Sequence, residues 1–274
     1  MIYFVGLDLA WSPKNNSAIS IAKLKSKSVA ELIFWKDKIS NDEEIISFIN
    51  NFIGKESCLI AIDAPLLVPN KTGRRIAEDI LQKLFMKYDA SAYPANRKRL
   101  NTYGGLRGEK IVSKLEKIGI KHNPYIKPRR NCRNVIEVFP HPAIVSIFNL
   151  EKILKYKRGE LRKRLIEYKR YQKLLMSLDN LIPKLKINKE LLNLDITKLR
   201  GNKLKQYEDL LDSIMCTYIA FYYWYWGENK CAVLGDMKHG YIVTPIKEDM
   251  KKLLKINSSL IIHEKKKVRF NRIL

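Results

Sequence analysis

Three carboxylates lie at or near the ends of short apolar runs, and they are the strongest candidates for chemistry in this chain. Asp8 interrupts the run 3–11, Asp63 closes the run 59–62, and Glu137 lies inside a run that two prolines stop. A carboxylate in a buried strand is costly to desolvate unless a cation or hydrogen-bond donors compensate its charge. Because this costly feature recurs, we expect the three acids to meet at one site.

Two further acids, Asp209 and Asp212, precede the longest apolar run, residues 214–226. This pattern predicts a buried helix, and acids three positions apart share one face of a helix. Acids in a first turn also complement the helix dipole, which explains Asp209 better than Asp212.

The order of the predicted elements would place Asp8 beside Asp63. Strand-like runs cover 3–11, 18–24 and 31–36, a helix is predicted over 41–53, and another strand covers 59–63. A right-handed crossover makes the first and last of these strands parallel. Ligands bind beyond the carboxyl ends of such strands. Alone, each aspartate could instead cap a turn or a short helix.

Crowded acids raise one another's pKa values and repel unless divalent cations lie between them. An all-oxygen ligand set favours Mg²⁺ or Mn²⁺, since zinc sites recruit Cys or His. His141, between two prolines, could orient a water or bind phosphate, but no second histidine stands at metal-ligand spacing. Two such ions ~3.5–4 Å apart activate a water and stabilise the leaving oxygen of a phosphodiester.

The chain of 274 residues carries 52 Lys and Arg against 28 Asp and Glu, a formal net charge of +24. A surplus of this size predicts attraction to a polyanion, with nucleic acid as the first candidate partner. A genome of skewed base composition is the alternative explanation. In the basic, turn-rich stretch 66–130, Arg74, Arg75 and Arg107 are candidates for phosphate contacts, although solvated surface charge is the favoured interpretation for any one of them.

Residues 150–206 combine helical periodicity with heavy positive charge, including Lys157 and Arg158. Tyrosines interleaved with these cations, such as Tyr168 and Tyr171, can stack on bases while the cations hold phosphates. A solvated helical face is the alternative.

The remaining composition indicates a protein of the cytoplasm with no membrane partner. The four cysteines fall in no C-x-x-C spacing, which suits free thiols in a reducing compartment. The first nine residues lack the basic start of a signal peptide. The run 214–226 is shorter than the ~18–20 residues that span a bilayer.

An ordered set of motifs resembles the domain-of-unknown-function 429 family, over about residues 3–245. The motifs are Gly6-Leu7-Asp8-Leu9-Ala10-Trp11, Ala61-Ile62-Asp63-Ala64-Pro65-Leu66, Gly73-Arg74-Arg75, Ile136-Glu137-Val138-Phe139-Pro140-His141-Pro142, Glu208-Asp209-Leu210-Leu211-Asp212, and Leu234-Gly235-Asp236 with Gly240-Tyr241-Ile242-Val243. That family is described as predicted nucleases of ribonuclease H-like fold. The order of elements is also similar to that of Holliday-junction resolvases, whose metal-binding acids lie on the first strand, the fourth strand and the last helix.

By position, the resemblance implies that Asp8 bridges both ions and that Asp63 and Asp212 each help to hold one. Glu137 or Asp209 would complete the metal ligands or position the water. We therefore expect one α/β domain over residues 1–274, with a ribonuclease H-like mixed sheet of about five strands and helices on both faces. An insertion at about 66–130 and a basic helical segment at about 150–206 would be added to it.

The expected function is a two-metal nuclease that hydrolyses phosphodiester bonds of DNA or RNA, with a homodimer left open. A non-catalytic nucleic-acid-binding protein on the same fold is the first alternative. A sugar- or metabolite-kinase-like phosphotransferase ranks last, because a second glycine-rich phosphate-binding strand pair is missing.

Overall fold

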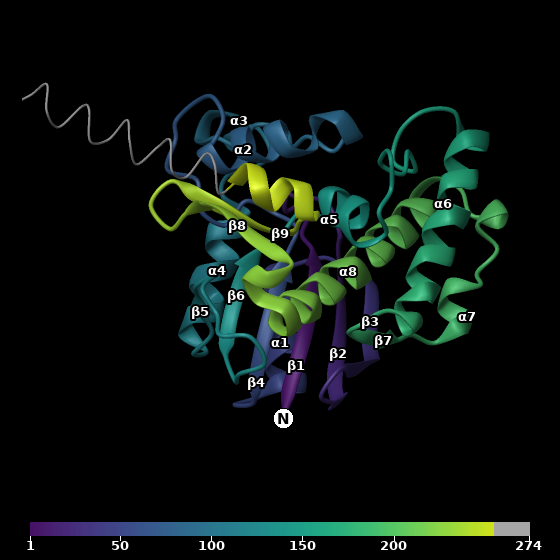
Figure 1. Cartoon of the computed structure of the whole chain (residues 1–274), viewed down its shortest axis with the longest axis horizontal. Coiled ribbons are helices and arrows are strands. Elements are labelled where there is room, and N and C mark those ends of the chain that lie inside the picture. Colours follow the sequence, from purple (N-terminus) through teal and green to yellow (C-terminus); the bar gives the residue numbers. More distant parts are fainter. Residues whose placement is uncertain (255–274) are drawn as a thin grey trace, which may run out of the picture.

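The computed structural model describes residues 1–254, which form a central sheet with helices on both faces (Figure 1). The strands are β1 (Ile2–Asp8), β2 (Ser17–Ser26), β3 (Val29–Ile39), β4 (Ser57–Ile62), β5 (Lys121–His122), β6 (Arg133–Glu137), β7 (Lys184–Lys186), β8 (Cys231–Asp236) and β9 (Gly240–Pro245). The helices are α1 (Asp42–Ile53), α2 (Ile76–Phe85), α3 (Arg97–Asn101), α4 (Arg107–Lys117), α5 (Pro140–Ile147), α6 (Leu161–Met176), α7 (Lys189–Leu192) and α8 (Gly201–Trp226). Short 3₁₀ turns are η1 (Met86–Tyr88), η2 (Ser177–Asn180), η3 (Ile196–Lys198) and η4 (Gly227–Asn229).

The sheet has seven strands in the order β5-β6-β4-β1-β2-β3-β7. β1, β2 and β3 form the expected antiparallel meander, and β4 returns parallel to β1 after α1. β6 then pairs parallel to β4. The α/β class and the mixed sheet are thus as predicted, but about five strands is an underestimate. The two additional strands, β5 and β7, are edge strands of two and three residues, too short to show an apolar pattern.

Helix α8 crosses the face of the sheet in direct contact with the backbone of β1. A Cβ built on Gly6, in the middle of β1, would lie 2.0 Å from the Ser213 carbonyl oxygen and 2.2 Å from the Thr217 nitrogen. The contact is reinforced on β2, where the Ser20 and Thr217 hydroxyl oxygens lie 2.6 Å apart. A side chain at position 6 would push the helix away, so this glycine brings α8 against the sheet.

The two faces of the sheet have separate cores. Phe4 and Ala61 pack in the core that includes α8 and α6, whereas Val5 and Ile62 pack in the core that includes α1 and α4. Successive strand residues point to opposite faces. The α8 face therefore receives Gly6 and Asp8 from β1.

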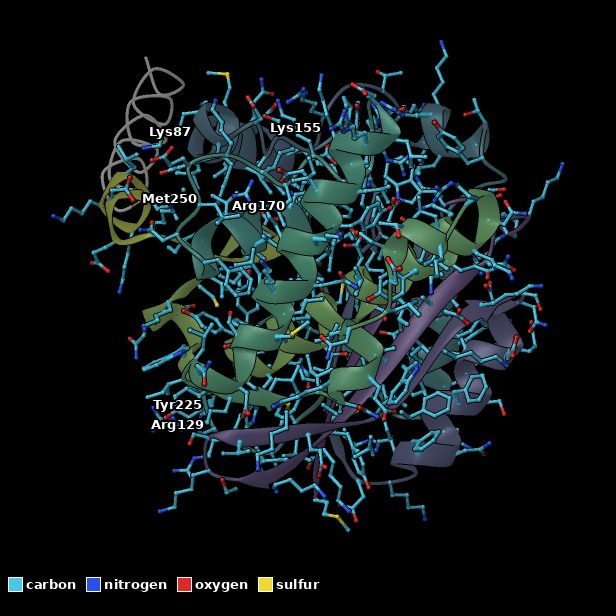
Figure 2. All side chains as sticks on the ribbon, turned by 90° about the vertical axis from the view of Figure 1, so that its right-hand side faces the viewer. Lys87, Arg129, Lys155, Arg170, Tyr225 and Met250 are labelled. Carbon is cyan, nitrogen blue, oxygen red and sulfur yellow. The ribbon has the colours of Figure 1, made fainter. Side chains whose placement is uncertain are left out.

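The two added regions lie on opposite sides of the sheet in Figure 1, the region 66–130 at the top and left and the region 150–206 at the right. The region 66–130 supplies α2, α3 and α4, and the region 150–206 supplies α6, β7 and α7. Figure 2 labels Arg170, which lies on α6, and Lys155, which precedes this helix in the chain. Within residues 1–254, no helix combines the length and apolar character needed to cross a bilayer.

Candidate functional site

Asp8 and Asp63 lie at neighbouring strand ends, as the strand order predicts. Leu7 pairs with Ile62 in the parallel β1–β4 register, and the Asp63 backbone N–H donates to the Leu7 carbonyl oxygen at 2.9 Å. Asp8 has the same parity as Gly6, which faces α8. The pairing therefore directs both aspartates toward the α8 side of the sheet.

Helix α8 brings Asp209 and Asp212 to the same place. Both residues lie just before Ser213, whose carbonyl contacts Gly6, and their charges act on Asp8. Asp212 is completely buried, while Asp8 and Asp209 line an open pocket. Four carboxylates from two strand ends and one helix thus form an acidic cluster, consisting of Asp8, Asp63, Asp209 and Asp212.

Asp212 is held by hydroxyl groups from the region 150–206. The Tyr156 and Tyr171 hydroxyls donate to its Oδ1 at 2.6 Å and 3.1 Å. Its Oδ2 forms no hydrogen bond of good geometry in the described chain, but it faces the Lys157 ammonium nitrogen at 2.7 Å. Burial pushes the pKa of Asp212 upward, but the Lys157 ammonium group and the Tyr156 hydroxyl outweigh burial and lower it below its ordinary value. Asp212 is therefore the anion of the cluster.

These contacts correct the expectation that the tyrosines of the basic segment stack on bases. Tyr156, Tyr168 and Tyr171 are fully buried, and the Tyr168 hydroxyl donates to Glu208 at 2.5 Å. Their rings belong to the core between α6 and α8. They hold carboxylates in place and offer no surface to a base.

Asp209 has a cation of its own. The Lys205 ammonium nitrogen lies 2.5 Å from its Oδ1 and 2.7 Å from Oε1 of Glu208, one helical turn away. Burial raises the pKa of Asp209, and Lys205 partly offsets that rise. The α8 helix therefore presents an acid and its counter-ion together at the pocket.

Asp8 and Asp63 have the least compensation. Burial, followed by the charges of Asp209, Asp212 and Asp63, raises the pKa of Asp8 well above its ordinary value, against the opposing effect of Lys157. Burial is also the main cause that raises the pKa of Asp63 to about 7. Without a further cation, Asp63 is partly protonated at neutral pH, and the raised pKa of Asp8 likewise favours its protonated form.

Lys157 acts as the shared cation of the cluster. Its ammonium group pairs with Asp212, and the charges of Asp8 and Asp63 also raise its pKa, which burial alone would lower. Its side chain is 30% exposed. Across residues 1–254, no three Asp, Glu, His or Cys side chains form a ready metal-binding group. Lysine ammonium groups, those of Lys157 and Lys205, pair with the acids instead.

The acidic cluster nevertheless fits a divalent cation chemically. It offers carboxylate oxygens alone, which are the ligands that Mg²⁺ and Mn²⁺ prefer. The Oδ2 atom of Asp212 is buried without a well-formed hydrogen bond, and Asp8 and Asp63 need positive charge to ionise. Displacement of one lysine ammonium group would make these oxygens available.

Glu137 is not brought into the cluster. It pairs with Ile62 across the β4–β6 register, so its side chain starts on the face opposite α8. Both of its oxygens receive the Arg75 guanidinium at 2.6 Å and 2.9 Å, and Oε2 also accepts the Leu66 N–H at 2.8 Å. Its charge still raises the pKa of Asp63. Glu137 is paired with Ile62 and not with Asp63, so its side chain lies on the other face of the sheet from the acids that it was expected to join.

Two of the predicted phosphate-binding arginines are structural. Arg75 is buried and also pairs with Glu78 at 2.8 Å. Arg107 is buried, pairs with Asp42 at 2.8 Å, and donates to the Ala10 carbonyl oxygen at 2.8 Å. These guanidinium groups are not available to a phosphate. Arg74 is half-buried, and its Nη1 atom has no hydrogen-bond partner in the described chain.

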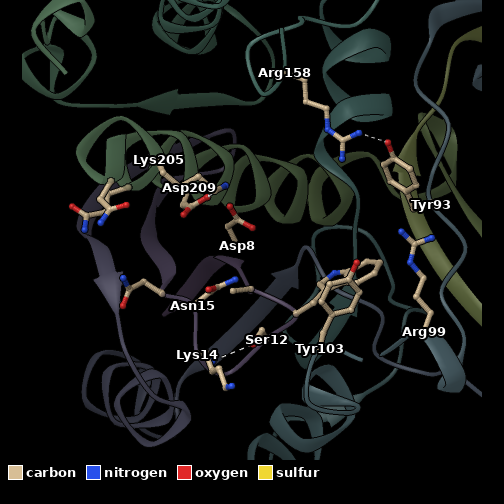
Figure 3. Close-up of a pocket in the computed structure, with 15 residues that line it drawn as sticks. Asp8, Ser12, Lys14, Asn15, Tyr93, Arg99, Tyr103, Arg158, Lys205 and Asp209 are labelled. Carbon is tan, nitrogen blue, oxygen red and sulfur yellow. Dashed lines mark hydrogen bonds and ion pairs between the residues drawn. The ribbon is translucent and has the colours of Figure 1, made fainter. Parts of the chain in front are cut away.

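A pocket of about 670 Å³ opens beside the acidic cluster (Figure 3). Asp8, Asp209 and Lys205 line one part of it, and Arg158 and Arg99 line another. Arg158 thus lies where a ligand of the cluster would extend. Its Nη1 donates to the Tyr93 hydroxyl at 2.5 Å.

The sequence patterns did not assign Lys205 to the site, and they did not predict that Tyr156 and Tyr171 hold a carboxylate or that His141 is a buried neutral group. Burial lowers the pKa of His141 to about 3, so its ring is neutral beside the cluster. Lys205 has a readable signal, because it stands four residues before Asp209 on a helix. Tyr168, Tyr171 and Leu175 follow the i, i+3, i+7 spacing of a buried stripe, which predicts core tyrosines.

Comparison with known proteins gives one match. The model of a family described as "Protein of unknown function (DUF429)" matches residues 6–238 of the chain. A search of curated proteins and a search of solved structures found no match.

Proposed function

We propose that this chain, which belongs to the DUF429 family, hydrolyses phosphodiester bonds of nucleic acid with Mg²⁺ or Mn²⁺. The observation that carries the proposal is the convergence of Asp8, Asp63, Asp209 and Asp212 beside an open pocket in a chain of net charge +24. Four carboxylates in one place are costly to ionise together, which favours a site that binds cations.

The four acids would hold the metal ions. When bound, such ions polarise the phosphodiester and lower the pKa of the attacking water. Arg99, Arg158 and Lys14 line the same pocket and supply positive charge for the phosphates of the strand. Tyr156 and Tyr171 fix the Asp212 carboxylate, so that one ligand is ionised and oriented before any ion arrives.

The test is cleavage by the whole chain and by Asp8→Asn. Labelled branched DNA, single strands and RNA–DNA hybrids are incubated with Mg²⁺ or Mn²⁺, and products are separated by size. We expect cleavage by the parent and a loss of at least about 100-fold in Asp8→Asn, since even changes behind a metal ligand cost 10- to 100-fold. The matched control is Asp37→Asn, which changes an exposed aspartate on β3 and should retain activity. Equal activity in Asp8→Asn and the parent would remove Asp8 from the mechanism.

A second candidate function is nucleic-acid binding without cleavage. It is favoured by one observation, the ammonium groups of Lys157 and Lys205, which already neutralise Asp212 and Asp209. This function predicts salt-sensitive binding that persists in a chelator, with no product from any of the substrates above.

A further inference from the structure

The wall of the pocket away from the acidic cluster is built of aromatic rings and guanidinium groups. The Trp11 and Tyr103 rings meet edge to face, with centroids 5.7 Å apart. The Arg99 guanidinium lies 6.0 Å from the Trp11 ring centroid and 5.3 Å from that of Tyr93. Arg158 lies on the same Tyr93 ring at 5.2 Å. These five side chains, Trp11, Tyr93, Arg99, Tyr103 and Arg158, are called the aromatic wall below.

Three separate parts of the chain build the aromatic wall. Trp11 follows β1, Tyr93, Arg99 and Tyr103 come from the region 66–130, and Arg158 comes from the region 150–206. In Figure 3, Tyr103, Arg99, Tyr93 and Arg158 follow one another along one side, opposite Asp8 and Asp209. Both added regions of this fold therefore converge on the same pocket.

The wall is held in place from behind. Arg107 donates to the carbonyl oxygens of Ala10 and Ser12, on either side of Trp11, at 2.8 Å and 3.3 Å. Gly104, with a φ of 105°, lets Pro13 approach so closely that an added Cβ would lie 3.0 Å from its ring. These contacts hold the backbone that carries the Trp11 and Tyr103 rings.

The tyrosines of the wall differ from the other tyrosines near the site. Tyr93 is 54% exposed and Tyr103 is 40% exposed, whereas Tyr156, Tyr168 and Tyr171 are fully buried. Exposed aromatic rings can stack on the flat faces of a ligand, and the neighbouring arginines can bind its negative charges. The bases and phosphates of an unpaired strand offer both.

We propose that the aromatic wall binds unpaired nucleotides, so that the substrate of the site is a single-stranded segment of DNA or RNA. A duplex keeps its base faces stacked inside the helix, where no ring can reach them. A pocket of about 670 Å³ has the size of a small-molecule site and can enclose an unstacked nucleotide. Amide side chains in the same pocket, Asn15, Asn16, Asn202 and Gln206, can donate to and accept from a base edge.

This inference rests on the proposed function in one respect: the phosphate that follows the stacked base would lie near the acidic cluster. Its test uses binding alone. Fluorescence anisotropy measures the affinity of the whole chain for a labelled 20-nucleotide single strand of DNA, the same strand of RNA, and the corresponding DNA duplex. EDTA is present throughout, so no cleavage occurs.

The variants are Tyr93→Ala and Tyr103→Ala, with Tyr125→Ala as the matched control. Tyr125 is 52% exposed and lies in the loop before β6, where Pro124 contacts Tyr223 near the C-terminal end of α8. We expect single strands to bind more tightly than the duplex. Each ring variant should weaken single-strand binding at least about fivefold, while Tyr125→Ala binds as the parent does.

The arginines give an independent readout. Arg99→Ala should reduce the slope of log K against log salt by about 0.7, the value for one phosphate contact to a single strand. Tyr103→Ala should weaken binding and leave the slope unchanged. The control is Arg129→Ala, since Arg129 lies 4.4 Å from the Tyr225 ring centroid in a similar pair away from α6 (Figure 2).

Three results would overturn the inference: tighter binding of the duplex, ring variants that bind like Tyr125→Ala, or no single-strand binding at low salt. Ring-dependent binding of single strands without any metal-dependent cleavage would leave the inference standing and reject the proposed nuclease function. Cleavage lost in Asp8→Asn but unaffected by the ring variants would do the reverse. Tighter binding of the DNA strand or of the RNA strand would show which of the two nucleic acids the aromatic wall prefers.

Discussion

Lys157 places one ammonium group among three carboxylates, and this residue decides how the acidic cluster is charged. It pairs with Asp212 at 2.7 Å and acts on Asp8 and Asp63. A divalent cation that entered the cluster would compete with it for the same oxygens. Lys157 would therefore compete with such an ion, and in the structure its ammonium group offsets the charge of Asp212.

Substitution of Lys157 tests this competition. Lys157→Met removes the ammonium group and retains much of the side-chain volume, so Mn²⁺ should bind at least about tenfold more tightly, equivalent to about 1.4 kcal/mol. Isothermal titration with Mn²⁺ measures the change. Lys155→Met is the matched control, because Lys155 is 66% exposed and its partner is Asp89, outside the cluster. Unchanged or weaker Mn²⁺ binding by Lys157→Met would show that the ammonium group does not compete with the metal.

At the scale of the elements, the register between strands decides on which face of the sheet each of the three strand-end acids lies, although the sequence around each acid is similar. Asp8 and Asp63 could be predicted, because apolar runs and a crossover helix fix two parallel strand ends. Glu137 has the same local pattern, but it lies opposite Ile62 and points to the other face. A shift of one residue reverses the face of a side chain, and no pattern within a single strand reveals its register.

The same limit applies to pairs that are distant along the chain. Tyr156 and Lys157 meet Asp212 across more than 50 residues, a contact that depends on how the region 150–206 folds over α8. The buried part of helix α8 was predicted from its apolar run. Its close approach at Gly6 was not, because a glycine in a strand has several explanations.

A variant of Glu137 distinguishes its structural role from the predicted metal-binding role. Glu137→Gln leaves the buried Arg75 guanidinium without its charge partner, and breaking such a pair costs about 3–5 kcal/mol. We expect a loss of that order in urea unfolding, with unchanged Mn²⁺ affinity per folded molecule. Asp8→Asn should behave in the opposite way, because neutralising one acid relieves repulsion and removes a metal ligand. Loss of Mn²⁺ binding with full stability in Glu137→Gln would instead place Glu137 among the ligands.

At the scale of the whole molecule, the charge is divided between a positive surface and a small acidic centre. The net charge of +24 coexists with four acids gathered at one edge of the sheet, next to a wall of arginines and exposed rings. Both added regions contribute side chains to that pocket. The α/β class and the order of the main strands follow from the sequence pattern, whereas the pocket depends on loops whose paths it does not determine.

The most direct measurement of the central claim is a crystal structure of the chain grown with Mn²⁺, with anomalous scattering recorded at the manganese edge. The account predicts an anomalous peak coordinated by Asp8 together with Asp63, Asp209 or Asp212, and a displaced lysine ammonium group. An acidic cluster with no peak at saturating Mn²⁺, and with Lys157 and Lys205 still paired to Asp212 and Asp209, would contradict it.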